Sequence, residues 1–184
     1  MFLPNAREVL DHKIALARSY GFTPVSPGDL AVPETETRHQ RGLAISAINE
    51  SLMSSADLII ANLTPFRGVA DDIGTAFELG FMCARGCPAF AFSNCTENHF
   101  ERVSGLYGGE VRLGPDGRHR GPDGFALENF DMADNLMLDG GIVARNGAVI
   151  TRKVAPDRLF LDLTAFEECL NLAAERLLKT AASA

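Results

Sequence analysis

The chain has 184 residues, of which 46% are hydrophobic and 22% are charged, a balance typical of a globular domain rather than a disordered chain. Its formal net charge of −7 argues against a protein that grips a nucleic-acid polymer, because phosphate contacts need clustered Lys and Arg. No apolar run reaches the ~18 residues that a membrane-spanning helix needs, and no signal peptide is visible. We therefore expect a cytoplasmic protein without membrane contact.

The cysteines give no sign of a metal site. The four of them have neither CxxC spacing nor a paired histidine motif, so we expect reduced thiols, no bound metal and no cofactor. These residues are Cys83, Cys87, Cys95 and Cys169.

The first part of the chain reads as helix, strand and helix. Asn5 is placed to cap a helix over residues 7–21, which Gly21 ends. Residues 22–27 then read as a short strand that leaves into a loop rich in Pro and Gly. After a polar stretch, an amphipathic pattern predicts a helix over residues 43–56.

The middle of the chain carries the clearest pattern. DLIIANL, residues 57–63, is an apolar run typical of a parallel strand that is buried on both faces. A loop leads from it into a helix over residues 73–86, and residues 88–93 form a second strand of the buried type. This order predicts a βαβ unit in a parallel sheet.

The pattern dissolves between residues 94 and 130, where Gly-Pro-Asp-Gly occurs twice and predicts two exposed turns. A helix at 132–142, a strand-like segment at 158–163 and a helix from Thr164 follow. We see no domain boundary, and so we expect one domain over residues 1–184 with a loop-rich insertion at about 94–130.

Polar residues gather where the strand at 57–63 ends. Ligands of a parallel α/β sheet bind outside the carboxyl ends of its strands. Gly68 and Gly74 allow close approach to the backbone. The carboxylates at the helix start suit either a helix cap or a functional pair, and the residues alone leave both interpretations open. The candidate residues here are Asn62, Gly68, Asp71, Asp72 and Gly74.

Glu78 stands out because it lies between Phe77 and Leu79 in the apolar sequence AFELGFM. A buried, unpaired carboxylate is unfavourable, so we expect Glu78 to face a cleft or a partner. With Asp72 near, two carboxylates in distinct environments allow one acid and one nucleophile at neutral pH. A glutamate that is only exposed or ion-paired remains the alternative.

Residues 56–92, ADLIIANLTPFRGVADDIGTAFELGFMCARGCPAFAF, resemble the signature of the nucleoside 2-deoxyribosyltransferase family. That signature combines a strand with an Ala-Asp start, a Pro/Gly loop, an Asp and then Gly-Thr-x-x-Glu-x-Gly. DNLML, residues 134–138, is similar to the family's Asn-Leu-Met element, and residues 2–27 resemble its first helix and second strand. We expect a three-layer α/β sandwich with a mostly parallel, flavodoxin-like sheet.

The resemblance also implies roles for individual residues. Glu78 falls on the family's nucleophile, which forms a covalent glycosyl-enzyme intermediate. Asp72 falls on the aspartate that lies near the sugar and protonates the departing base. Asn135 falls on the asparagine that reaches into a neighbouring subunit's site to hold the sugar, which implies a homo-oligomer of at least two chains.

The chain departs from the family pattern in three places. The family begins with a strand before its first helix, and Met1 sits where that strand has already finished, so we expect the first strand to be absent. Some members use an Asp in the second helix to recognise the base, and here the region reads INESL, which puts Asn49 or Glu50 in that place. The insertion at 94–130 is longer than in compact members and is placed to shape a pocket rim or an interface.

The preferred function is transfer of 2-deoxyribose from one nucleobase to another, with a nucleoside and a nucleobase as small-molecule partners. One alternative is a hydrolase of the same family, acting on a nucleoside or a nucleoside 5′-monophosphate with water as acceptor. Another, from a different class, is a non-catalytic nucleotide-binding module that has kept the fold. Base release distinguishes the last from the other two.

Overall fold

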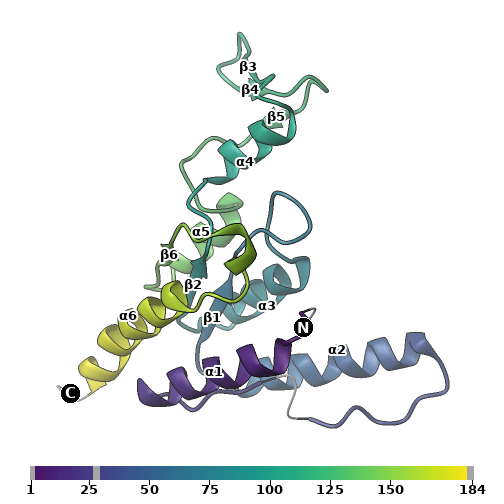
Figure 1. The fold of residues 1–184 in the computed structure, drawn as a ribbon, viewed down its shortest axis with the longest axis vertical. Coiled ribbons are helices and arrows are strands. Elements are labelled where there is room, and N and C mark those ends of the chain that lie inside the picture. Colours follow the sequence, from purple (N-terminus) through teal and green to yellow (C-terminus); the bar gives the residue numbers. More distant parts are fainter. Residues whose placement is uncertain (1–2, 27–29, 182–184) are drawn as a thin grey trace. The chain divides into compact units, whose positions relative to one another are not determined.

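The computed structural model describes residues 3–26 and 30–181. Contacts group the chain into two compact units, residues 1–58 and residues 59–184. Among the described residues, the first unit contains helices only and the second contains every strand (Figure 1). The single domain expected from the sequence stays a prediction.

The unit of residues 1–58 carries helices α1 (Ala6–Ser19) and α2 (Arg38–Ser55). The first ends where the sequence predicts, because Gly21 adopts a φ of 88° that other residues rarely take. The second begins earlier than predicted. Thr37 accepts the Gln40 N–H while the Gln40 side chain accepts the Thr37 N–H, a capping box that starts the helix within the polar stretch.

The strand predicted at residues 22–27 is wrong for residues 22–26, which form no strand, and Pro27 lies outside the described residues. A strand exists only where a neighbouring strand satisfies its backbone groups. The described part of this unit contains no second strand to do so. The sequence of residues 22–27 therefore did not suffice to predict a strand, because no neighbouring strand is present to pair with it in the described part of this unit.

The unit of residues 59–184 is built on a parallel sheet. Its strands are β1 (Ile59–Asn62), β2 (Ala89–Ser93) and β6 (Val149–Thr151), in the order β1-β2-β6. The register pairs Ile59 with Ala89, and Ala91 with Val149. All five residues of β2 are buried, as its apolar sequence predicts for a central parallel strand.

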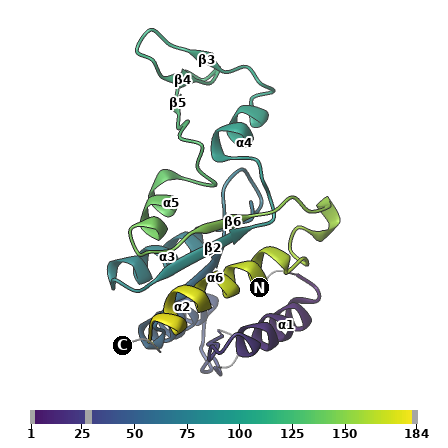
Figure 2. The same cartoon turned by 90° about the vertical axis from the view of Figure 1, so that its left-hand side faces the viewer.

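Helices cover both faces of this sheet. Helices α3 (Ile73–Ala84) and α5 (Leu136–Val143) pack on one face, and α6 (Thr164–Ala181) packs on the other (Figure 2). Leu79 of α3 and Ile142 of α5 are almost fully buried. On the other face, Phe166 of α6 packs against Phe92 of β2 with ring centroids 5.5 Å apart. The predicted α/β class, with a parallel sheet flanked by helices, is confirmed.

The third strand is not the one predicted. Residues 158–163 form no strand: Arg158 ends a 3-10 helix, Pro156–Arg158, and residues 159–161 form a turn. The strand is Val149–Thr151 instead. The Asn94 side chain donates to the carbonyls of Leu159 at 2.8 Å and Asp162 at 2.9 Å. These long-range bonds hold the apolar segment as a turn, and its sequence alone gives no sign of them.

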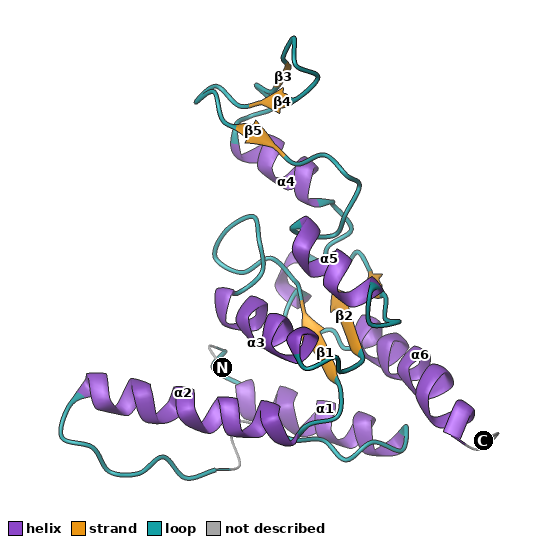
Figure 3. Cartoon of the chain, turned by 180° about the vertical axis from the view of Figure 1, so that it is seen from behind, coloured by secondary structure: helices purple, strands orange, loops and turns teal. Residues whose placement is uncertain are grey.

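The segment between residues 94 and 130 is more ordered than expected. It contains helix α4 (His99–Leu106) and an antiparallel sheet of β3 (Arg112–Leu113), β4 (His119–Arg120) and β5 (Ala126–Leu127) (Figure 3). Both Gly-Pro-Asp-Gly elements are the predicted turns. In each, the last glycine has positive φ and donates to the first, at 3.0 Å.

The four cysteines are free thiols, and Cys83 and Cys169 are buried. Within the described ranges, no helix has the length and apolar character to cross a bilayer.

Candidate active site

Strands β1 and β2 end side by side and their following loops are tied together. Asn62, the last residue of β1, accepts the backbone N–H of Thr64 at 3.0 Å, and the Thr64 hydroxyl accepts the backbone N–H of Asn94 at 3.0 Å. Thr64 and Asn94 are almost fully buried. The predicted substrate-binding residue Asn62 thus shapes the turn out of β1, at the sheet edge where ligands of parallel sheets bind.

The loop after β1 closes on itself before α3 begins. The Phe66 N–H donates to the Ala70 carbonyl at 2.9 Å, and the Arg67 guanidinium lies 4.9 Å from the centroid of the Phe66 ring. Arg67 has a φ of 56°. Gly68 is exposed at the tip, and a Cβ there would meet no atom within 4 Å. The space beside Gly68 is open, and its role in binding a substrate stays a prediction.

Asp72 is the N-cap of α3. Its Oδ2 accepts the backbone N–H of Gly74 at 3.2 Å, as a carboxylate at a helix start favours. A Cβ on Gly74 would lie 2.9 Å from that same oxygen. Gly74 therefore leaves room for the Asp72 carboxylate, and the cap and the glycine form one local arrangement.

Glu78 lies in the interior of α3 and is half-buried. Burial raises the pKa of its carboxyl, and the nearby charge of Asp72 raises it further. The two carboxylates thus lie within electrostatic reach of one another, as the sequence predicts. Asp72 accepts a hydrogen bond at the N-terminus of α3, whereas Glu78 lies among apolar residues within the helix, so the two carboxylates have different environments.

Asp71 is 8% exposed, and its environment differs again. Burial, followed by the charges of Asp134 and Asp72, raises its pKa to about 7. Its backbone N–H donates to Asp134 Oδ2 at 3.2 Å, and its own Oδ2 is buried without a hydrogen-bond partner. The sequence grouped Asp71 with the substrate-binding residues, and the structure places its carboxyl in the interior.

Asn135 is the N-cap of α5. Its Oδ1 accepts the backbone N–H of Met137 at 3.0 Å, and its Nδ2 donates to the Glu128 carboxylate at 2.9 Å. Glu128 also accepts the N–H of Leu136 at 3.1 Å. Both ends of the Asn135 amide thus make local bonds within this chain, and its role toward a sugar stays a prediction.

Asn49 lies in α2, within the unit of residues 1–58, and is half-buried. The proposed contact of Asn49 with a base stays a prediction.

Sequence reasoning missed the buried group formed by Asp134 of the loop before α5, together with Arg102 and His99 of α4. Asp134 and Arg102 form an ion pair at 2.8 Å, and His99 Nδ1 lies 3.6 Å from Asp134. Burial raises the pKa of the Asp134 carboxyl, although Arg102 and the bonded N–H groups oppose the shift. The one local signal was the position of Asp134 directly before Asn135.

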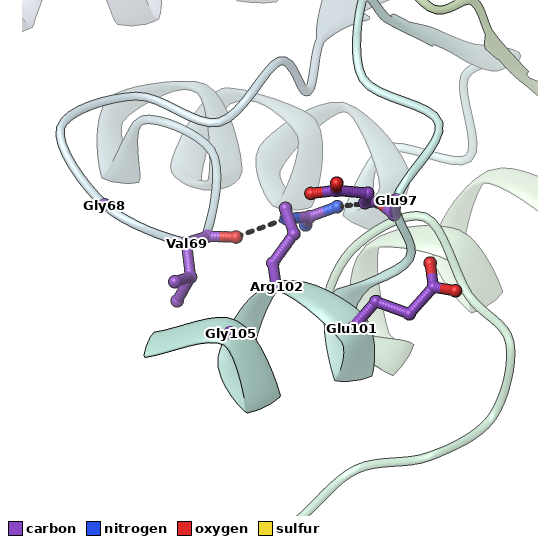
Figure 4. Close-up of a pocket in the computed structure, with 6 residues that line it drawn as sticks. All are labelled: Gly68, Val69, Glu97, Glu101, Arg102 and Gly105. Atoms are coloured by element: carbon purple, nitrogen blue, oxygen red, sulfur yellow. Dashed lines mark hydrogen bonds between the residues drawn. The ribbon is translucent and has the colours of Figure 1, made fainter. Parts of the chain in front are cut away.

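A surface hollow of about 460 Å³ lies between the loop after β1 and α4 (Figure 4). Neither Glu78 nor Asp72 lines it, whereas Gly68 does. The candidate site is therefore defined by the carboxylates of Asp72 and Glu78, and this hollow is a separate feature. Its lining residues are Gly68, Val69, Glu97, Glu101, Arg102 and Gly105.

The fold and site define an α/β protein with a carboxylate pair on the helix that follows its first parallel strand. Residues 1–137 match the family described as Nucleoside 2-deoxyribosyltransferase. The chain belongs to this family of glycosyl-transferring enzymes, which confirms the resemblance drawn from residues 56–92 and 134–138.

Two relatives show the extent of the similarity. The chain is 30% identical over 160 residues to uncharacterized protein C191.05c of Schizosaccharomyces pombe, covering 81% of this chain and 76% of that protein. The solved structure of a 2-desoxiribosyltransferase from Leishmania mexicana matches with a TM-score of 0.57 and 28% identity, covering 91% of each chain.

Proposed function

We propose that the chain is a nucleoside 2-deoxyribosyltransferase in which Glu78 is the nucleophile. A Glu78 oxygen bonds to the anomeric carbon of a deoxynucleoside as the N-glycosidic bond breaks, and the base leaves with its electron pair and a proton from Asp72. In the second step, a nitrogen of another base bonds to the same carbon, the Glu78 ester bond breaks and Asp72 recovers a proton.

The observation that carries the proposal is the placement of two carboxylates on one element, with Asp72 at the N-cap of α3 and Glu78 within the helix. Glu78 is half-buried in an apolar helix with its pKa raised by burial and by Asp72. A desolvated carboxylate is a stronger nucleophile than one in water, and a second carboxylate at the helix start is available for proton transfer.

The remaining predicted residues have supporting roles in the proposal. Gly68 and Gly74 let the substrate approach the backbone, while Asn62 and Asp71 shape the loop beneath it. Asn135 contacts the sugar in a neighbouring subunit's site. Asn49 contacts the base, so its replacement changes base preference more than turnover.

The test follows base exchange by chromatography, using a panel of deoxynucleosides with and without a free acceptor base. We expect exchange that requires the acceptor, and a Glu78→Gln variant that keeps less than about 0.1% of it, a loss typical of removing a nucleophile. Glu110→Gln, at an exposed position outside the helices, is the matched control and retains full activity.

A covalent adduct supplies the second readout. With the acceptor withheld, intact-protein mass should rise by one deoxyribosyl group, and peptide mapping should place the group on Glu78. Base release without exchange would replace the transferase with the hydrolase of the same family. Ligand binding without any base release would favour the non-catalytic module.

A further inference from the structure

Asp134 is a buried carboxylate that joins two loops of the candidate site. The residue is 1% exposed. Its Oδ2 accepts the backbone N–H of Asp71 at 3.2 Å, and its Oδ1 accepts the backbone N–H of Asn135 at 2.8 Å. Asp71 directly precedes Asp72, the cap of α3, and Asn135 caps α5. One carboxylate therefore connects the starts of both helices.

Arg102 holds Asp134 and fixes three loops at once. Besides its Nη2 bond to Asp134, it donates from Nε to the Val69 carbonyl at 2.6 Å and from Nη1 to the carbonyls of Glu97 at 2.5 Å and Ala133 at 2.8 Å. Figure 4 shows the guanidinium directed between Val69 and Glu97. The loops after β1, after β2 and before α5 thus meet on one planar cation.

Arg102 is the main counter-charge of Asp134. His99 Nδ1 lies 3.6 Å from Asp134 Oδ1 and has no hydrogen-bond partner, a separation too long for a hydrogen bond. Removing the arginine alone would leave a carboxylate in the interior with no ionic partner closer than His99 at 3.6 Å, which is strongly unfavourable.

A second arginine ties the same two helices at their other ends. Arg145 follows α5 and donates from Nε to the carbonyl of Cys83 at 2.9 Å, near the C-terminus of α3. Both arginines therefore link an end of α3 to an end of α5, but only Arg102 acts at the ends that carry Asp72 and Asn135. This pairing supplies a matched control.

We propose that Asp134 and Arg102 are positioning residues, which place Asp72 toward the sugar in the site of their own chain and Asn135 toward the sugar in the site of a neighbouring subunit. The proposal rests on the proposed function of Asp72 and Asn135. Asp134 is too deeply buried to meet a substrate, so it acts through the two backbone N–H groups that it holds.

The first test is amide hydrogen exchange of the ligand-free protein, which requires no activity. Asp134→Leu combined with Arg102→Met removes both buried charges together, so that no unpaired ion is left. We expect exchange in residues 66–72 and 135–139 to accelerate together, by about tenfold or more. Arg145→Met should leave both segments as they are. Protection that persists in either segment of the double variant would overturn the proposal.

The second test is steady-state kinetics on the same variants, well below their unfolding temperatures. We expect the double variant to raise KM and to lower kcat/KM by about tenfold or more, since small misplacements of reacting groups have effects of this size. Arg102→Lys, which keeps the charge but not the planar fork, should recover part of that loss. Arg145→Met should lower the unfolding temperature with kcat and KM unchanged.

The outcomes separate the two proposals. A double variant with altered stability but wild-type kcat and KM would leave only a structural role and overturn the inference. If the wild-type protein releases no base from any substrate, the proposed function fails on its own test. The hydrogen-exchange measurement would still decide whether Asp134 and Arg102 couple the two loops.

Discussion

Adjacent aspartates of this chain have opposite environments. Asp72 caps α3 through the Gly74 N–H, whereas Asp71 is 8% exposed with a buried, unpartnered oxygen. A single step along the backbone thus separates a carboxylate at a helix start from one in the interior. The chemistry of each follows from its surroundings, since both are the same residue type.

The raised pKa of Asp71 gives the first prediction. Its pKa is about 7 in the folded chain against an ordinary 3.8, so its contribution to stability is fully present below pH 3.8 and is lost as pH rises through about 7. Asp71→Asn cannot ionise and should therefore stabilise the protein at about pH 8 by on the order of 2 kcal/mol, with little effect near pH 4.

Urea unfolding at both pH values measures this difference. Asp131→Asn, at an exposed position, controls for the loss of one negative charge. An Asp71→Asn variant that gains no stability at the higher pH would show that ionisation of the buried Asp71 carboxyl does not destabilise the folded protein.

The pKa of Glu78 gives the second prediction. Nucleophilic attack needs the carboxylate, so kcat/KM should fall as pH drops through the raised pKa of Glu78, above the ordinary 4.5 of a glutamate. Asp72→Asn removes the charge that raises this pKa, while Asn still caps α3. The acidic limb should therefore move to lower pH, measured on the residual activity. An acidic limb that does not move would show that it does not report the ionisation of Glu78.

Helix α3 is the element on which the site depends, and two of its glycines are not equivalent. A Cβ at Gly74 would lie 2.9 Å from the capping oxygen of Asp72, whereas a Cβ at Gly80 would meet no atom within 4 Å. The same substitution therefore acts on the cap at one position and on helix propensity alone at the other. This contrast isolates the cap from the rest of the helix.

The third prediction uses that contrast. Gly74→Ala should destabilise the protein by about 1 kcal/mol and lower activity, because it displaces the Asp72 carboxylate. Gly80→Ala should stabilise it by roughly 0.5–1 kcal/mol with activity unchanged, because alanine is the better helix former. Thermal unfolding and base exchange check both. Equal activity in the two variants would show that activity does not depend on the position of the Asp72 carboxylate at the cap of α3.

At the scale of the whole molecule, large apolar side chains of the unit of residues 59–184 are exposed. Exposed apolar surface often marks a contact with another chain, and a homo-oligomer remains our proposal. The side chains concerned include Leu106, Leu113, Phe125, Phe130, Met137 and Val143.

Subunit complementation gives the fourth prediction. Glu78→Gln and Asn135→Ser should each be inactive alone, with serine retaining a capping oxygen for α5. If Asn135 serves the neighbouring subunit, mixing the two denatured variants equally and refolding them should restore about a quarter of the wild-type sites of a dimer. Base exchange measures the recovery. No recovery, with dimers present by sedimentation, would place Asn135 in its own subunit's site.

The sequence determined those features that depend on near neighbours along the chain. DLIIANL and PAFAFS both specify strands by their apolar runs, although only PAFAFS is buried throughout, because β1 lies at the end of the strand order and is mostly half-buried. Gly-Pro-Asp-Gly specifies its two turns. Asp72 before Gly74 specifies a cap, and the Glu78 helix follows from the same stretch. Each of these features depends on residues only a few positions apart, so it can be predicted from the local sequence pattern.

Only the tertiary structure decided features that depend on distant residues. Asn94 converts an apolar segment into a turn through carbonyls 65 and 68 residues away. Asp134 lies 32 residues from Arg102 and 63 from Asp71. Burial of Asp71 and then the charge of Asp134 raise the pKa of Asp71. No periodic pattern encodes such contacts, because burial and charge pairing depend on which loops the fold brings together.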